Sequence, residues 1–206
     1  MSIDKKSTRV RRSPEASREN ILNAAETLLV EHGPQTLKLT DVAKAAKVAN
    51  ATVLHHFGTI QGVQAALMER MIQQLANRIL DIDAPRESPF SAHGHDLRML
   101  FDAFEQRGAA RLAAWLELAD EARRMTSVRE AVEAVIEKRV QAEGAERDMV
   151  VDFTMVCVAL ALGVGLFGST VGELMGRPEG RTREMALEMM MSHLQTFISR
   201  AEQAEK

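Results

Sequence analysis

Proline placement is the feature that most restricts the fold of this chain. The five prolines stand at positions 14, 34, 85, 89 and 178, so residues 90–177 contain none. A proline inside a helix costs about 3 kcal/mol, and segments without proline therefore favour long helices. Alanine, leucine, methionine, glutamate and arginine predominate, tyrosine is absent, and alternating strand-like patterns are scarce. The sequence predicts an all-α fold.

Apolar spacing, together with the glycine and proline positions, predicts about nine helices. We expect them at about residues 17–32, 40–47, 51–57, 61–80, 93–107, 109–125, 127–143, 147–175 and 182–201. Three parts follow: a flexible basic arm at residues 1–16, a three-helix unit at residues 17–60, and a larger helical domain at residues 61–206.

Composition restricts the class of protein. Of the 206 residues, 46% are hydrophobic and 27% are charged, which suffices for a buried core and argues against a disordered chain. The single cysteine, Cys157, cannot form an intrachain disulfide, and the first thirty residues lack an apolar run typical of a secretory signal. We therefore expect a cytoplasmic protein.

Charge is distributed unevenly along the chain, whose formal net charge is −3. Residues 1–60 carry nine Lys and Arg against six Asp and Glu, whereas residues 61–206 carry seventeen against twenty-three. A basic amino-terminal part indicates an anionic partner there, either nucleic acid or a membrane surface.

Residues 36–57, TLKLTDVAKAAKVANATVLHHF, predict two short helices joined by a turn near residues 47–50. Small and apolar side chains are spaced so that the two helices can pack closely at a steep angle, which leaves the outer face of the second helix free to enter a DNA major groove. An ordinary helical hairpin inside an all-α domain is the alternative interpretation of the same spacing.

The surrounding residues resemble the DNA-binding region of the TetR family of bacterial transcriptional regulators. The resemblance covers about fifty residues and rests on Ile21-Leu22, Ala24-Ala25, His32-Gly33, Asp41-Val42-Ala43, Val48, Thr52, His55-His56, Phe57 and Leu67, in the order and spacing of the family. It implies a homodimer that places two recognition helices in successive major grooves of a palindromic double-stranded DNA operator. It also implies a carboxy-terminal domain that binds a small organic effector.

The resemblance also assigns contacts to individual residues. Base contacts are expected from Thr40, Asn50, Ala51 and His55, and phosphate contacts from Lys38, Thr52 and His56. The chemistry agrees, because Asn can bind adenine in bidentate fashion and Ala can contact a thymine methyl group, while hydroxyl, imidazole and ammonium groups can donate to phosphate oxygens.

The chain departs from the family pattern at three positions. Leu54 and Ile60 stand where the family usually has Tyr and Lys as phosphate contacts, and Lys38 replaces a Ser or Thr helix cap. Such losses lower affinity for DNA without removing the fold. Six cations between Lys5 and Arg18 could compensate from the arm, or the arm could be only a solvated tail.

The larger domain should supply an effector pocket and a dimer interface. Candidate pocket residues are Met68, Met71, Phe101, Phe104, Trp115, Met125, Phe153 and Met155, any of which could instead be plain core. Acidic residues, at Asp102, Glu105, Glu117, Asp120 and Glu121, could include a counter-ion for a cationic ligand or could lie on solvated faces.

Residues 153–172 form a run of twenty residues without a charge, which has the length of a membrane span. Four glycines lower its hydrophobicity and no Lys/Arg cluster flanks it, so we expect a helix buried between subunits and no membrane partner. Gly165, Gly168 and Gly172 are spaced to admit another backbone. The expected interface residues are Val156, Leu160, Val164, Phe167, Val171, Leu194 and Phe197.

Signals for an enzyme are weak. His93-Gly94-His95-Asp96 lacks a second ligand cluster with metal-site spacing, and the GxGxxG match at residues 163–168 follows no predicted strand. We expect no metal, no cofactor and no catalytic site. The sequence predicts a ligand-responsive homodimeric repressor; the alternative is a helical protein of this type that has lost specific DNA binding and acts through ligand or protein partners.

Overall fold

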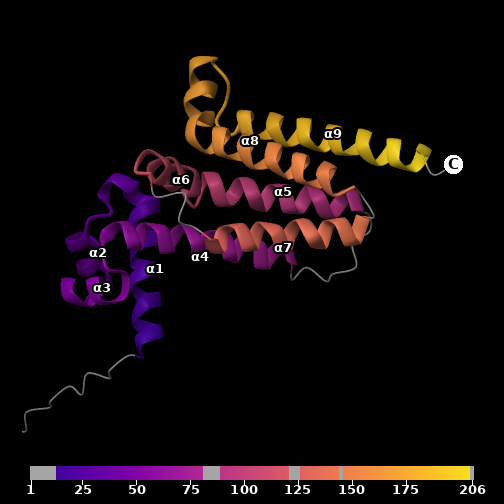
Figure 1. The fold of residues 1–206 in the computed structure, drawn as a ribbon. Coiled ribbons are helices and arrows are strands. Elements are labelled where there is room, and N and C mark those ends of the chain that lie inside the picture. The colour runs from indigo at the N-terminus through magenta and orange to yellow at the C-terminus, as the bar shows by residue number, and fades with distance from the viewer. Residues whose placement is uncertain (1–12, 81–88, 121–125, 144–145, 205–206) are drawn as a thin grey trace, which may run out of the picture.

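The computed structural model describes residues 13–80, 89–120, 126–143 and 146–204. In this part of the chain the structure is all helical and confirms the predicted fold class (Figure 1). The elements are α1 (Pro14–His32), a 3-10 turn η1 (Pro34–Thr36), α2 (Leu39–Ala46), α3 (Asn50–Phe57), α4 (Ile60–Leu80), α5 (Pro89–Glu105), α6 (Ala109–Leu118), α7 (Thr126–Glu143), α8 (Arg147–Leu174) and α9 (Arg181–Ala204).

The first helix begins earlier than the sequence pattern indicated. The Ser13 hydroxyl accepts a hydrogen bond of 3.1 Å from the Ala16 N–H, and Pro14 occupies the first turn, where a proline costs no hydrogen bond. Residues 14–16, predicted as part of the arm, are therefore helical, and residues 1–12 lie outside the described residues. Pro89 starts α5 in the same way, four residues before the predicted start.

The predicted helix at 109–125 is shorter in the structure. It ends as α6 at Leu118, where the Ala119 N–H bonds to the Trp115 carbonyl and Asp120 takes a left-handed φ of 56°. That conformation cannot continue a right-handed helix. Residues 121–125 lie outside the described residues.

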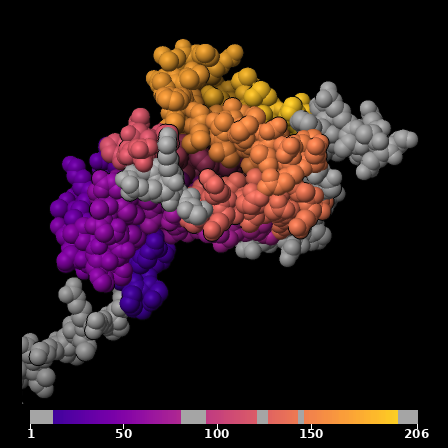
Figure 2. Space-filling view, viewed as in Figure 1, coloured from indigo at the N-terminus to yellow at the C-terminus, as the bar shows by residue number. Residues whose placement is uncertain are grey.

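Two units share one core. Helices α1 to α3 pack together at one end, and α4 runs from this unit along the larger domain, where it contacts α6 and α7 (Figure 1). Helix α5 packs against α8 and α9. The core is continuous from Val53 through Leu67 and Met71 to Phe101 and Leu112. Figure 2 shows the end of α8 and the start of α9 projecting beyond the rest of the molecule.

The glycines of α8 serve contacts within one chain. A β carbon on Gly165 would lie 2.8 Å from the Ala110 Cβ and 2.9 Å from the Phe104 carbonyl oxygen. The Gly168 carbonyl accepts a hydrogen bond of 2.9 Å from the Thr182 hydroxyl, and a β carbon on Gly172 would also meet Thr182. Close approach here is thus made by α5, α6 and α9, whereas the sequence suggested a second chain at these glycines.

Helix α8 has the length and composition of a membrane-spanning helix, and 22% of its most apolar stretch is buried inside the chain. Its buried side packs against α5, α6, α7 and α9. The other side leaves large apolar groups uncovered, with Phe167 62% exposed.

Candidate functional site

The α2–α3 pair is held in a rigid geometry. Val42 and Val53 are fully buried between the helices, and the tight turn is made by Lys47, which adopts a left-handed φ of 56°. The Val48 N–H then bonds back to the Ala43 carbonyl at 3.0 Å. The Asn20 side-chain amide donates to the Ala46 carbonyl at 2.8 Å and joins the end of α2 to α1.

The predicted DNA-contact residues lie on the outside of this unit. On α3, Asn50, Ala51 and His55 are exposed, and Thr52 and His56 are half-buried. Lys38 and Thr40 are exposed at the start of α2. The outer face of α3 is therefore open to a partner, as a helix in a major groove requires.

The Arg18 cation and two imidazole rings lie where α3 ends beside the start of α1. The Arg18 guanidinium lies 5.1 Å from the centre of the Phe57 ring, and the His56 ring stands 5.5 Å from the His55 ring. The pKa of the Glu15 carboxyl is lowered because its own backbone N–H and the Ser13 hydroxyl donate to it, and because His56 lies nearby.

The three departures from the family pattern have different structural outcomes. Lys38 is the N-cap residue of α2 and makes no side-chain capping bond. Ile60 is half-buried and packs against the core at the start of α4, so it stabilises the fold in place of a phosphate contact. Leu54 is 42% exposed on the outer face of α3.

A cavity of about 550 Å³ lies inside the larger domain. Helices α4 to α8 line it with Met68, Ile72, Leu75, Ala76, Ile79, Leu100, Phe104, Ala113, Ala114, Glu117, Val128, Ala131, Val132, Val135, Thr154, Val158, Leu162 and Leu166. This size and apolar character suit a drug-sized organic ligand.

The predicted pocket residues scatter around this cavity. Met68 and Phe104 line it. Met71 and Phe101 are buried in the core, and Phe153 stacks on His193 at 6.4 Å between ring centres. Trp115 and Met155 are exposed at 40% and 61%. Met125 lies outside the described residues.

Sequence reasoning missed the wall formed by α7. Val128, Ala131, Val132 and Val135 all line the cavity, and they recur at helical spacing along α7. This apolar stripe was the available signal, and it consists of valine and alanine, whereas the predicted pocket residues were all methionine or aromatic.

An ionic cluster joins α1 to two walls of the cavity. Glu26 accepts from the Arg70 Nη2 of α4 at 2.6 Å and from the Arg107 Nη2 at 2.5 Å, in the turn that follows α5. Arg107 also donates to Gln74 at 2.8 Å, and Arg70 also donates to Glu19 at 2.6 Å. Glu26 thus links α1 both to α4 and to the α5–α6 turn.

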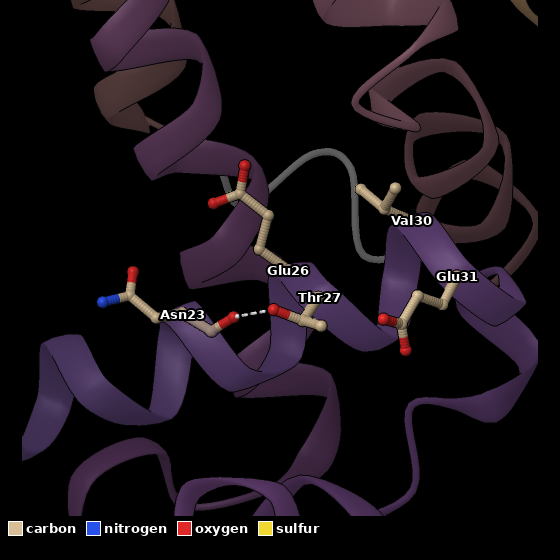
Figure 3. Close-up of a pocket in the computed structure, with 5 residues that line it drawn as sticks. All are labelled: Asn23, Glu26, Thr27, Val30 and Glu31. Atoms are coloured by element: carbon tan, nitrogen blue, oxygen red, sulfur yellow. Dashed lines mark hydrogen bonds between the residues drawn. The ribbon is translucent and has the colours of Figure 1, made fainter.

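The outer side of α1 carries a second hollow, of about 420 Å³. Asn23, Glu26, Thr27, Val30 and Glu31 line it (Figure 3). The Thr27 hydroxyl donates to the Asn23 carbonyl at 3.1 Å, and Glu26 is engaged in the ionic cluster.

The predicted dimer-interface residues divide into two sets. Val156, Phe167 and Val171 are exposed on α8, and Leu160 is half-buried. Val164 and Leu194 are buried inside one chain, and the side chain of Phe197 lies outside the described residues. Other exposed apolar residues lie on α8, on α9 and just after α8: Met155, Leu174, Met175, Met185 and Met189. We name these five together with Val156, Phe167 and Val171 the α8–α9 apolar surface.

Metal chemistry has no support in the described part of the chain, which contains no group of three or more His, Cys, Asp or Glu able to hold an ion. His95 is exposed, and Asp96 forms an ion pair of 2.5 Å with Arg139. The GxGxxG match lies inside α8.

Comparison with known proteins gives a consistent result. Residues 21–67 match the family described as bacterial regulatory proteins, tetR family. The HTH-type transcriptional repressor Rv3405c of Mycobacterium tuberculosis is 34% identical over 88 residues, which cover 41% of this chain and 46% of that protein. The HTH-type transcriptional regulator Rv1255c of the same species is 29% identical over 108 residues and 50% of each chain. The chain thus matches about half the length of these relatives.

Two solved structures share the fold over nearly the whole chain. A TetR transcriptional regulator from Legionella pneumophila has a TM-score of 0.65 at 15% identity, covering 90% of this chain and 99% of that one. The multidrug binding protein EbrR, complexed with imidazole, has a TM-score of 0.56 at 19% identity, covering 85% and 93%.

Proposed function

We propose, because this chain belongs to the TetR family of bacterial regulatory proteins, that it acts in the cytoplasm as a homodimeric repressor that binds a palindromic operator and is released by a small organic effector. The observation that carries the proposal is the exposed outer face of α3, on which Asn50, Ala51 and His55 stand clear of the core. In this proposal the two α3 helices of a dimer enter successive major grooves, about 34 Å apart.

Base reading and phosphate binding can be separated by mutation. We expect Asn50→Ala to relax preference at particular base pairs, at about 1–3 kcal/mol per lost contact. Lys38→Gln should weaken binding to all sequences and lower the slope of log affinity against log salt by about 1. Deleting residues 1–12 should also weaken binding to all sequences and lower the salt slope, because it removes five cations that could meet phosphates.

A gel shift on DNA from beside the protein's own gene measures these effects. Arg177→Gln is the control, because it removes one exposed cation in the α8–α9 turn, far along the chain from α3. An equal loss for Asn50→Ala on every sequence would contradict base reading. Absence of any specific binding would favour the alternative function, that of a family member that has lost specific DNA binding. The apolar Leu54 on the outer face of α3 is the feature that supports this alternative.

Dimerisation would cover the α8–α9 apolar surface. Exposed apolar surface of this extent is uncommon on a monomer, and covering it with a second copy also accounts for the length and apolarity of α8 without a membrane. We expect the protein to sediment as a dimer at micromolar concentration, and Phe167→Glu to produce a helical monomer. Val30→Glu, which places the same charge on an exposed valine of α1, should remain dimeric. A monomeric unaltered chain would refute this part.

A further inference from the structure

The charge and polarity of the residues that line the cavity restrict the chemical class of effector that it can bind. Among its described lining residues, Glu117 alone is charged and Thr154 alone has a hydroxyl group. The other lining side chains are apolar. Burying a polar group without a hydrogen-bond partner costs about 1–3 kcal/mol, so these walls disfavour ligands that carry many hydroxyl, amide or phosphate groups.

Glu117 places a negative charge at the carboxy-terminal end of α6. It stands in the last turn of α6, which ends at Leu118 and has no basic residue in that turn. The carboxy-terminal end of a helix carries partial negative charge and favours cations, so a carboxylate there is repelled by its own helix. No hydrogen bond or ion pair joins the Glu117 side chain to another residue in the described part of the chain.

We infer that the cavity takes a lipophilic organic cation, with its hydrocarbon body between α4, α5, α7 and α8 and its cationic head beside Glu117. This inference rests on the proposed function, in which the cavity is the effector site. The carboxylate and the end of α6 both attract a positive head. An anionic head of the same size would be repelled by the Glu117 carboxylate and by the carboxy-terminal end of α6.

Three probes with one alkyl chain and different heads test the inference: decyltrimethylammonium, n-decanol and decyl sulfate. Binding is measured by calorimetry on the full chain and by the emission of Trp115, the only tryptophan, which lies two residues before Glu117 on α6. We expect the cation to bind most tightly and the sulfate most weakly. The difference should narrow at high salt, because Glu117 is exposed to solvent.

Charge variants give the sharper readout. Glu117→Gln should weaken the cation about threefold to fivefold, the range of a solvent-exposed ion pair, and should leave n-decanol unchanged. Glu117→Lys should reverse the order and favour decyl sulfate. Glu179→Gln, which removes one exposed carboxylate from the α8–α9 turn, should change nothing.

The outcomes separate the ligand class from the site. If decyl sulfate or n-decanol binds the unaltered protein as tightly as the cation, or if Glu117→Gln weakens all three probes equally, the inferred class is overturned and the cavity remains the effector site. Ala113→Phe is designed to fill the cavity and should weaken every probe. If Ala113→Phe leaves binding unchanged, the probes do not bind in the cavity and both proposals about it fail. If no probe binds the unaltered protein, the inferred class is overturned. In either case the operator gel shift still tests DNA binding.

Discussion

The ionic cluster at Glu26 permits a quantitative prediction for Glu26→Gln. The carboxylate holds two guanidinium groups, and the exposed fractions are 21% for Glu26, 10% for Arg70 and 31% for Arg107. Removing one member of a fully buried pair costs about 3–5 kcal/mol, and removing an exposed pair costs about 0–1 kcal/mol. The partial burial places this cluster between the two limits.

Arg70 and Arg107 have other hydrogen-bond partners besides Glu26, which reduces the expected loss of unfolding free energy. Without the Glu26 charge, Arg70 keeps Glu19 and the Leu22 carbonyl, and Arg107 keeps Gln74. We therefore expect Glu26→Gln to lower the free energy of unfolding by about 2 kcal/mol, measured by urea titration with circular dichroism at fixed chain concentration. A second change, Arg107→Gln, should then cost less than it costs in the unaltered chain, because the Glu26–Arg107 ion pair is already lost and only the Gln74 contact remains to be removed.

The control lies on the same helix. Glu31 is 57% exposed and its only described ion pair is with His32 at 3.7 Å, so Glu31→Gln should cost less than about 0.5 kcal/mol. If Glu26→Gln and Glu31→Gln have the same unfolding free energy, the cluster does not stabilise the junction between α1 and the larger domain, and the reasoning from burial is refuted.

Three further predictions concern single positions. Gly58→Ala should cost about 1–3 kcal/mol through backbone strain alone, because Gly58 has φ +72° with ψ −52° and open space around it; unchanged urea stability would contradict this. Gly165→Ala should cost about 1–3 kcal/mol by overpacking, since its new β carbon would meet the Phe104 carbonyl, and a loss below about 0.5 kcal/mol would show that α5 and α6 give way freely. Burial raises the pKa of the Cys157 thiol from 9.0 to about 11, so a thiol reagent at about pH 8 should label the folded chain far more slowly than the urea-unfolded chain. Because the raised pKa belongs to the folded state, stability should fall as pH rises from about 9 to 11, and Cys157→Ala should lack that fall.

Much of the fold could be predicted because its signals are local. The end of α1 at Gly33 and the turn at Lys47 after α2 each depend on a few neighbouring residues. The helices that precede them also depend on local sequence. The predicted positions of helix ends were less accurate where a capping residue or a left-handed residue sets the end. Ser13 caps the start of α1, and the left-handed Asp120 follows the end of α6. The outward face of α3 also followed from spacing alone, because Val53 must point inward.

The amino-acid sequence by itself determined the helical class, the α2–α3 unit and the residues available on its outer face, since these depend on backbone preference and spacing over a few turns. Only the tertiary structure decided which apolar side chains face a void. Phe101 and Phe104 stand three residues apart on α5 and both are buried, yet only Phe104 lines the cavity. It also decided that Gly165 admits Ala110 and that Glu26 meets both Arg70 and Arg107. These outcomes depend on how distant helices approach one another, and residues 26 and 107 share no local pattern that would reveal their contact.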